Sequence, residues 1–238
     1  MGELRQMKIY KGPLFSIPLA HLMWLSYTEY TAPPVLIDAL EYLDREELMS
    51  VEGLFREPGD TEEINFLRNQ YDSGEAVNFS TISTPHSAAS LLKLFFRKLP
   101  EPLFTFKEYD NFKGLWKIDD DQTRINQATQ CIQNLPVINR FVIYQLFDYL
   151  HRLSLKGSIN KMVPENLGIV WGPTGKKKYK SKKKVLSNPF FFFTVLWQKE
   201  EDPMEQTIAS QTLSNVVGFI IEKYSEIMSK FSTEFQGK

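Results

Sequence analysis

An arginine in a short turn is the residue of this chain best suited to act on another molecule. Arg56 lies in the stretch GLFREPGD, residues 53–60, after two apolar residues and before a Pro-Gly pair. Turns hold side chains out from a rigid scaffold, and proteins often place working residues there. The planar, permanently charged guanidinium suits the oxygens of a phosphate on a partner. The alternative is a surface arginine that caps a carbonyl or pairs with Glu57 or Asp60.

A basic pair follows in a later apolar segment. Lys93 and Arg97 are four positions apart, so on a helix they project from one side. The apolar stripe beside them consists of Leu92, Phe95, Phe96 and Leu99. Two interpretations stay open. The long side chains lie along the edge of a core helix with their charges in water, or the pair receives an acidic or phosphate-bearing partner.

Asn166 is the next candidate. It follows Pro164 and Glu165 and precedes the apolar run LGIVWGP, residues 167–173. Its side chain either bonds the local backbone or offers its amide to a partner.

Helices must position these residues, because apolar residues recur at helical spacing through nearly the whole chain. The clearest stretches are residues 36–43, 125–132, 136–153 and 213–227. A helix over roughly residues 87–98 carries Lys93 and Arg97. It ends at LPEP, residues 99–102, because two prolines cannot continue a helix.

A further helix is predicted directly after the Arg56 turn, from Asp60 or Thr61 to Gly74. Asp60 and Glu63 have the spacing of a capping box, in which each side chain bonds the backbone N–H of the other residue. The apolar face of this helix consists of Ile64, Phe66 and Leu67. No segment alternates like a strand, so the sequence predicts a single all-α domain with long functional loops.

The composition fits a folded protein of one large domain or two small ones. Of 238 residues, 42% are hydrophobic and 13% aromatic, which is ample for a core. The net charge of -1 gives no overall attraction to nucleic acid or membrane. The single cysteine, Cys131, excludes an intramolecular disulfide and fits a reducing, cytoplasmic compartment. Residues 1–10 do not look like a signal peptide, and no apolar stretch is long enough for a membrane span.

Metal and nucleotide sites are not predicted. The three histidines, His21, His86 and His151, are scattered, so no ligand set with metal spacing occurs. The stretch GPTGK, residues 172–176, superficially matches a phosphate-binding loop. However, Lys177 occupies the Ser/Thr position of that loop and Val170 the position of its first glycine. The chain is therefore not expected to hydrolyse GTP by itself.

Three stretches together resemble the RhoGAP domain family, the activators of Rho-type small GTPases. The first stretch, GLFR at residues 53–56 with Gly59, resembles the arginine-finger motif of the family. The second, LLKLFFRKLPEPL at residues 91–103, resembles its most recognisable segment. The third, NLGIVWGP at residues 166–173, resembles its third block. They occur in the order and spacing of the family, and FSIPL, residues 15–19, is similar to its opening segment. The resemblance covers about residues 14–230. It leaves residues 1–13 as an N-terminal extension and residues 231–238 as a C-terminal tail.

The resemblance implies a role for each candidate residue. Arg56 matches the catalytic finger. Lys93 and Arg97 match the basic pair beside it, of which Lys93 faces the GTPase and Arg97 helps to fix the finger loop. Asn166 matches an interface asparagine. Pro58 stands where the family usually has a small polar residue, which would stiffen the loop and remove one N–H donor.

The expected function is activation of Rho/Rac-type GTPases in their GTP-bound form, by an arginine supplied in trans. The partner binds GTP and Mg²⁺, so this chain is expected to need no cofactor or metal of its own and to have no GTPase activity of its own. We expect a cytoplasmic monomer without a nucleic acid partner. A rival interpretation is a non-catalytic module that binds the GTPase without accelerating it.

A second rival concerns a lysine-rich loop inside the domain, at residues 176–184. Its basic residues are Lys176, Lys177, Lys178, Lys180, Lys182, Lys183 and Lys184. This loop is either a solvated insertion or a contact with an anionic membrane, and the latter would make the protein a membrane adaptor recruited through the loop. The run Phe190, Phe191, Phe192 and Phe193, extended by Trp197, is expected in a helix buried on more than one side.

Overall fold

The computed structural model describes residues 14–25, 32–172 and 202–235, which form an all-α domain without any strand in these ranges. The predicted fold class is confirmed. The α-helices are α1 (Leu19–Leu25), α2 (Pro34–Leu43), α3 (Glu46–Met49), α4 (Thr61–Ser73), α5 (Pro85–Lys98), α6 (Tyr109–Gly114), α7 (Asp121–Gln133), α8 (Val137–Ser154), α9 (Gly157–Asn160), α10 (Pro164–Trp171), α11 (Pro203–Glu222), α12 (Tyr224–Met228) and α13 (Ser232–Phe235). Short 3₁₀ helices are η1 (Phe79–Thr81), η2 (Leu115–Lys117) and η3 (Ser229–Phe231).

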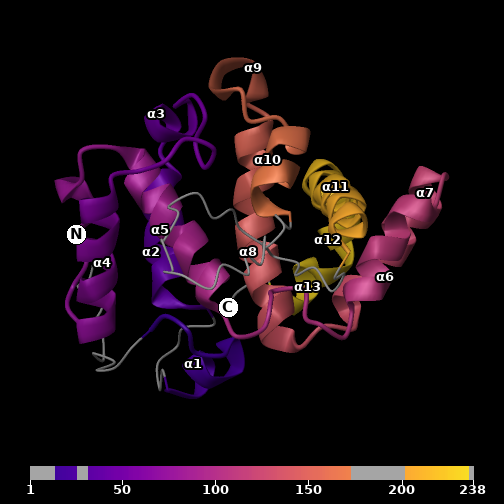
Figure 1. Cartoon of the computed structure of the whole chain (residues 1–238), viewed down its shortest axis with the longest axis horizontal. Coiled ribbons are helices and arrows are strands. Elements are labelled where there is room, and N and C mark those ends of the chain that lie inside the picture. Colours follow the sequence, from indigo (N-terminus) through magenta and orange to yellow (C-terminus); the bar gives the residue numbers. More distant parts are fainter. Residues whose placement is uncertain (1–13, 26–31, 173–201, 236–238) are drawn as a thin grey trace.

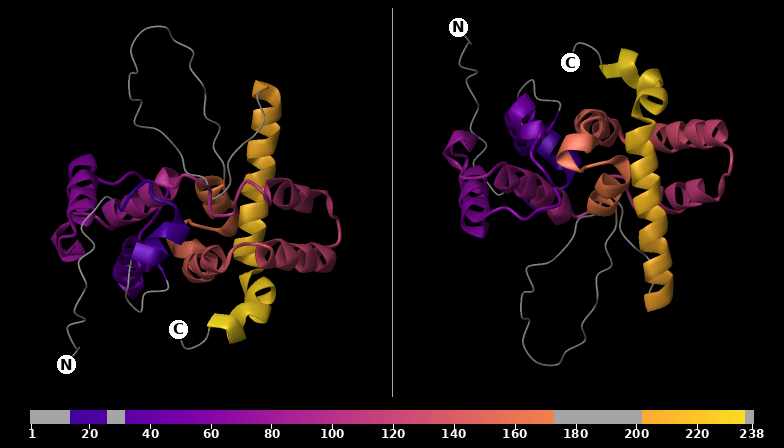
Figure 2. Two further views of the ribbon diagram at one scale, coloured as in Figure 1. Left: turned by 90° about the horizontal axis from the view of Figure 1, so that it is seen from below. Right: turned by 90° about the horizontal axis from the view of Figure 1, so that it is seen from above.

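Two groups of helices lie on either side of α8 (Figure 1). On one side α5 packs against both α2 and α4. On the other side, α6 and α7 lie side by side and extend outward from α11, which α6 contacts, as Figure 2 shows. Helix α10 contacts both α8 and α11, so it stands at the junction of the two groups.

Helix α10 lies unusually close to α11. A Cβ atom added to Gly168 would come within 2.3 Å of the Ser214 carbonyl oxygen, so only glycine fits this approach. The two backbones are therefore packed directly on each other, which makes α10 a rigid support for the residues that it carries.

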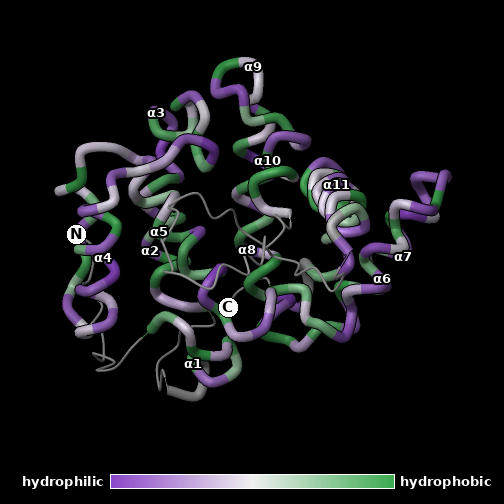
Figure 3. Tube along the Cα trace, in the orientation of Figure 1, coloured by the Kyte–Doolittle hydropathy of each residue, from purple (hydrophilic) through white to green (hydrophobic). Residues whose placement is uncertain are grey.

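The core is apolar and rich in aromatic side chains. Hydrophobic residues concentrate along α8 and the helices around it, while the outer end of α7 is hydrophilic (Figure 3). The Phe104 ring makes edge contacts with Phe112 and Phe147, with ring centroids 4.4 and 5.7 Å apart. Such contacts add a directional term to the burial of apolar surface.

The predicted helices occur close to their expected positions, as α2, α4, α5, α7 and α8. Helix α5 begins at Pro85, two residues before its predicted start, because the Thr84 hydroxyl caps it and proline suits a first helical turn. The predicted last helix is divided into α11 and α12, because Lys223 departs from helical backbone angles, with φ -93° and ψ 19°.

Only half of the predicted capping box forms. The Asp60 Oδ1 accepts hydrogen bonds from the backbone N–H groups of Glu62 and Glu63, both at 2.9 Å. The Glu63 carboxylate does not return a bond to Asp60. It accepts instead from the Ser83 N–H and the Ser87 hydroxyl, and the Ser87 Oγ accepts the Asp60 N–H at 3.0 Å. The start of α4 is thereby tied to α5 and not only to itself.

The predicted apolar face of α4 is wrong at Phe66. This side chain is 58% exposed, whereas Leu67 is fully buried and Ile64 packs partly against the core. The buried face of α4 is narrower than predicted because α5 is the main neighbour of this helix. Gly74 ends the helix as predicted, in the left-handed conformation.

The side chains of Phe231 and Phe235, in the stretch predicted as a C-terminal tail (residues 231–238), contact the domain. Phe231 and Phe235 are buried, and the Phe235 ring lies 5.3 Å from that of Phe141. An ion pair of 2.6 Å joins Arg140 to Glu234.

None of the described helices is long and apolar enough to cross a membrane. The lysine-rich loop, the phenylalanine run and Trp197 lie outside the described residues. Their roles stay predictions.

Candidate functional site

The backbone around Arg56 forms a tight, well-bonded turn between α3 and α4, here called the Arg56 turn (residues 53–59). Gly53 and Phe55 both have positive φ angles, of 69° and 71°. The Gly53 carbonyl accepts the N–H groups of Arg56 and Glu57, each at 2.8 Å. Glycine adopts positive φ easily, but phenylalanine does so only when its surroundings enforce it. The conformation of Phe55 therefore identifies it as the constrained residue of the turn.

Burial of the Phe55 ring supplies that constraint. The side chain is fully buried, with ring centroids 5.3 Å from Trp171 and 6.0 Å from Tyr149. Because Phe55 is directed into the core, the adjacent Arg56 side chain is left at the surface.

Replacing Phe55 with alanine should therefore unfold the protein more easily. We expect Phe55→Ala to lower the free energy of unfolding by about 3–5 kcal/mol, the usual cost of removing a buried phenylalanine ring. Urea denaturation measures this, with Phe66→Ala as the control, because Phe66 is exposed on the adjacent α4. Equal losses for the two variants would mean that Phe55 does not anchor the turn.

One face of α5 holds the turn from the other side. His86, Ser90, Lys93 and Arg97 follow one another at helical spacing along this face. The Ser90 hydroxyl accepts the Gly59 N–H at 3.1 Å, and the Lys93 ammonium donates to the Phe55 carbonyl. The Arg56 turn is thus bonded to α5 at Phe55, in its middle, and at Gly59, its last residue.

Lys93 is a buried cation, only 6% exposed. Burial, with a smaller contribution from Arg97, lowers the pKa of Lys93 to about 8, and Glu57 opposes this shift. Arg97 is half-buried, and burial lowers its pKa as well. The resemblance implies that Lys93 faces a partner and that Arg97 fixes the turn. In the protein alone, Lys93 bonds the turn backbone at the Phe55 carbonyl.

Arg56 itself is exposed, with 41% of its side chain accessible. Its Nε lies 3.2 Å from the Glu57 carboxylate, which is 52% exposed. This is the ion pair that the surface interpretation of Arg56 predicts. Exposed pairs of this kind contribute only about 0–1 kcal/mol, so the guanidinium is readily available to a stronger acceptor.

His86 lies beside these charges. Burial lowers its pKa, the Glu57 carboxylate raises it and the Lys93 ammonium lowers it, which are the effects expected of close neighbours. The net effect is a pKa below the usual value of histidine.

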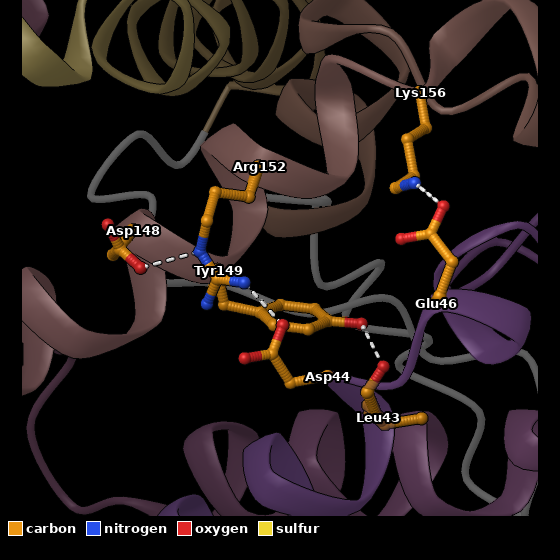
Figure 4. A network of polar contacts seen from close by, with 7 residues as sticks. All are labelled: Leu43, Asp44, Glu46, Asp148, Tyr149, Arg152 and Lys156. Carbon is orange, nitrogen blue, oxygen red and sulfur yellow. Dashed lines mark hydrogen bonds and ion pairs between the residues drawn. The ribbon is translucent and has the colours of Figure 1, made fainter.

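A second set of polar contacts joins α8 to the segment before the turn (Figure 4). The Tyr149 hydroxyl donates to the Leu43 carbonyl at 3.2 Å. Arg152 pairs with Asp44 and with Asp148, and Lys156 pairs with Glu46. The pair of Arg152 and Asp148 is local, within α8. The sequence offered no local signal for the contacts with Leu43, Asp44 and Glu46, because these partners lie more than a hundred residues away.

Asn166 lies in the first turns of α10, partly buried. Its Nδ2 donates to the Lys161 carbonyl at 2.7 Å, so the local-backbone interpretation holds for the protein alone. Ile169 is three positions further along α10 on the same side, and it is 55% exposed. The sequence indicated only an apolar run here and did not distinguish Ile169 from its buried neighbours.

The described residues contain no group of three or more metal-ligating side chains close enough to hold an ion. The chemistry that the site offers is that of a presented guanidinium, with a basic helix face behind it.

Known proteins are similar to this chain in sequence and in architecture. The family model for the RhoGAP domain matches residues 33–177. The chain is 35% identical to human Rho GTPase-activating protein 1 over 159 residues, which are 67% of this chain and 36% of that protein. It is 29% identical to human Rho GTPase-activating protein 24 over 210 residues, which are 86% of this chain and 25% of that protein. It therefore spans about a third or less of the length of these relatives.

The fold has a counterpart among solved structures. The crystal structure of human Rho GTPase activating protein 15 superposes with a TM-score of 0.75 and 25% sequence identity. The match covers 95% of this chain and 99% of that one.

Proposed function

The chain belongs to the RhoGAP domain family, and on that premise we propose that it stimulates GTP hydrolysis by Rho-type small GTPases by placing Arg56 in the active site of the GTPase. One observation carries the proposal more than any other. The backbone of the Arg56 turn is bonded to α5 and its Phe55 ring is buried, while the Arg56 side chain extends into solvent with a weak ion pair.

The chemistry requires a cation that the partner does not supply. As the γ-phosphoryl group leaves, negative charge spreads over its oxygens and over the leaving phosphate. A guanidinium held in place before the reaction stabilises that charge without reorganising at the moment of transfer. The fixed turn meets this requirement, because the backbone on both sides of Arg56 is already ordered.

In this proposal the GTPase supplies the rest of the active site. GTP and Mg²⁺ bind to the GTPase, so this chain acts without a cofactor of its own. In this proposal, Asn166 and Ile169 form the neighbouring contact surface on α10, and Lys93 and Arg97 support the turn. Asn166 would exchange its bond with the Lys161 carbonyl for one with the partner.

A single-turnover assay tests the function. Rho-type GTPases preloaded with GTP are mixed with increasing amounts of the chain, and phosphate release is followed. We expect acceleration that saturates with concentration and that differs among the GTPases of a panel. Binding without acceleration for every GTPase would favour the non-catalytic module.

A further inference from the structure

Four side chains at helical spacing join the end of α8 and α9 to the segment that leads into the Arg56 turn. Tyr149, Arg152, Lys156 and Asn160 are separated by three or four residues, so they lie along one side of this helical stretch. Their contacts follow the opposite segment in order, to Leu43, Asp44, Glu46 and Met49. Figure 4 shows the contacts of Tyr149, Arg152 and Lys156.

The members of this row differ in burial. Arg152, which pairs with Asp44, is 42% exposed, and Glu46, which pairs with Lys156, is 78% exposed. Both ion pairs therefore contribute little to stability. Tyr149 and Asn160 are 1% and 0% exposed. Buried hydrogen bonds cannot be replaced by water, so these two residues set the geometry.

Asn160 is bonded at each polar atom of its side chain. Its Nδ2 donates to the Met49 carbonyl at 2.9 Å and to the Leu153 carbonyl at 3.0 Å. Its Oδ1 accepts the Met162 N–H at 2.8 Å. One buried side chain thus joins the segment before the turn, the end of α8 and the connection to α10.

Two adjacent backbone carbonyl groups link the Arg56 turn to α10. The Asn160 carbonyl accepts the Gly53 N–H at 2.8 Å, at the first residue of the Arg56 turn. The next carbonyl, that of Lys161, accepts the Asn166 amide. Lys161 has a positive φ of 61°, which fixes the relative direction of the two carbonyls. Asn160 therefore links the position of the turn to that of Asn166.

From this geometry we propose that Asn160 and Tyr149 are positioning residues, which act by setting the place of the Arg56 turn relative to α10. This inference rests on the proposed function. Tyr149 holds Leu43 and supports the Phe55 ring, while the Asn160 side chain holds Met49 and thereby keeps its own carbonyl in place to bond Gly53. Because α10 is fixed on α11 at Gly168, loss of these bonds displaces the turn and leaves α10 in place. The rate of hydrolysis should suffer more than the affinity.

The kinetic test compares Asn160→Ser and Tyr149→Phe with Asn139→Ser. Asn139 is the matched control, because it is a buried asparagine of α8, the helix that carries Tyr149, and its amide bonds the Leu103 carbonyl at 2.8 Å, away from the turn. We expect Asn160→Ser to lower the maximal single-turnover rate about 10- to 100-fold, the scale of a misplaced catalytic group. The concentration at half-maximal rate should change less than about 3-fold, because the contact surface is intact.

Tyr149→Phe keeps the ring against Phe55 and removes only the hydroxyl, so it should remain folded. A reduction of the maximal rate of about 3-fold is expected for it, since one hydrogen bond is lost. Rates are normalised to the folded fraction, measured by circular dichroism. Wild-type maximal rates for Tyr149→Phe and for folded Asn160→Ser, or equal losses in Asn139→Ser, would overturn the proposal.

Amide hydrogen exchange gives a readout that a loss of global stability alone does not produce. In Asn160→Ser and Tyr149→Phe, the amides of Gly53, Arg56 and Glu57 should exchange faster relative to core amides of α11, whereas in Asn139→Ser their relative rates stay unchanged. If these amides keep their relative protection, the positioning role is wrong. If wild type does not accelerate any GTPase, the proposed function fails, and the exchange experiment alone still decides whether Asn160 and Tyr149 hold the turn.

Discussion

Arg56→Ala should bring GTP hydrolysis by the partner back to nearly its unassisted rate. Arginine supplied in trans contributes about 10³–10⁵ in rate in the GTPase systems for which the effect is known, and we expect a loss on that scale here. The turn should keep its shape, because its hydrogen bonds to α5 and the buried Phe55 ring do not involve the Arg56 side chain. Binding to the GTPase should therefore be largely retained.

Two further variants separate the charge of Arg56 from its shape. Arg56→Lys keeps the positive charge but loses the planar fork, so it should not restore full activity. Glu57→Gln is the matched control at the neighbouring exposed position. It removes the ion pair of Arg56, so the rate should not fall. Equal hydrolysis rates for wild type and Arg56→Ala would refute the catalytic role and leave the non-catalytic binding module as the better interpretation.

Lys93→Met should separate activity from stability. Methionine fills a similar space without the charge, so the Phe55 carbonyl loses its bond from Lys93 while the packing is kept. We expect a maximal rate about 10- to 100-fold lower, because the turn carrying Arg56 is less well fixed. Thermal stability should not fall, because the variant no longer buries a cation. Unchanged maximal rates with weaker binding at low salt would place Lys93 on the interface instead.

The pH dependence of stability provides a second measurement on the same variant. The pKa of Lys93 is about 8 in the folded protein, compared with 10.5 for the lysine side chain of the unfolded chain. Between these values the unfolded chain binds more protons than the folded one, so this residue makes the free energy of unfolding rise with pH. Urea denaturation across that range should show the rise in wild type relative to Lys93→Met. Parallel curves would mean that Lys93 is not a buried cation.

Much of the fold was predictable, because helices are local structures. The periodicity around Leu36 and Leu43 reports α2, and the prolines after Leu99 report the end of α5. Asp60 was recognisable as a cap from its position alone. Its expected reciprocal partner, Glu63, instead bonds Ser83 and Ser87, which are twenty or more residues away. No local sequence pattern predicts such distant hydrogen-bond partners.

The sequence predicted the exposed residue of the site, Arg56, but not how other residues hold the Arg56 turn in place. Arg56 stands out because a turn and its flanking residues are contiguous. The burial of Lys93 beneath the Phe55 carbonyl depends on how α5 meets the turn, and helical spacing alone left both interpretations of this residue open. Asn160 was missed for a similar reason. An asparagine near the end of a helix is ordinary, and its bond to Met49 closes a loop of 111 residues.

The contact between Phe55 and Trp171 has an optical consequence. The indole of Trp171 is completely buried and touches the residue immediately before Arg56, whereas Trp116 is 43% exposed. Indole emission moves to longer wavelength when water reaches the ring. A displacement of the turn that withdraws the Phe55 ring would therefore change the intrinsic fluorescence of this one tryptophan. Trp171 is thus an intrinsic label at the point where the Arg56 turn meets the core, and stopped-flow fluorescence should report a movement of that turn if a GTPase binds there.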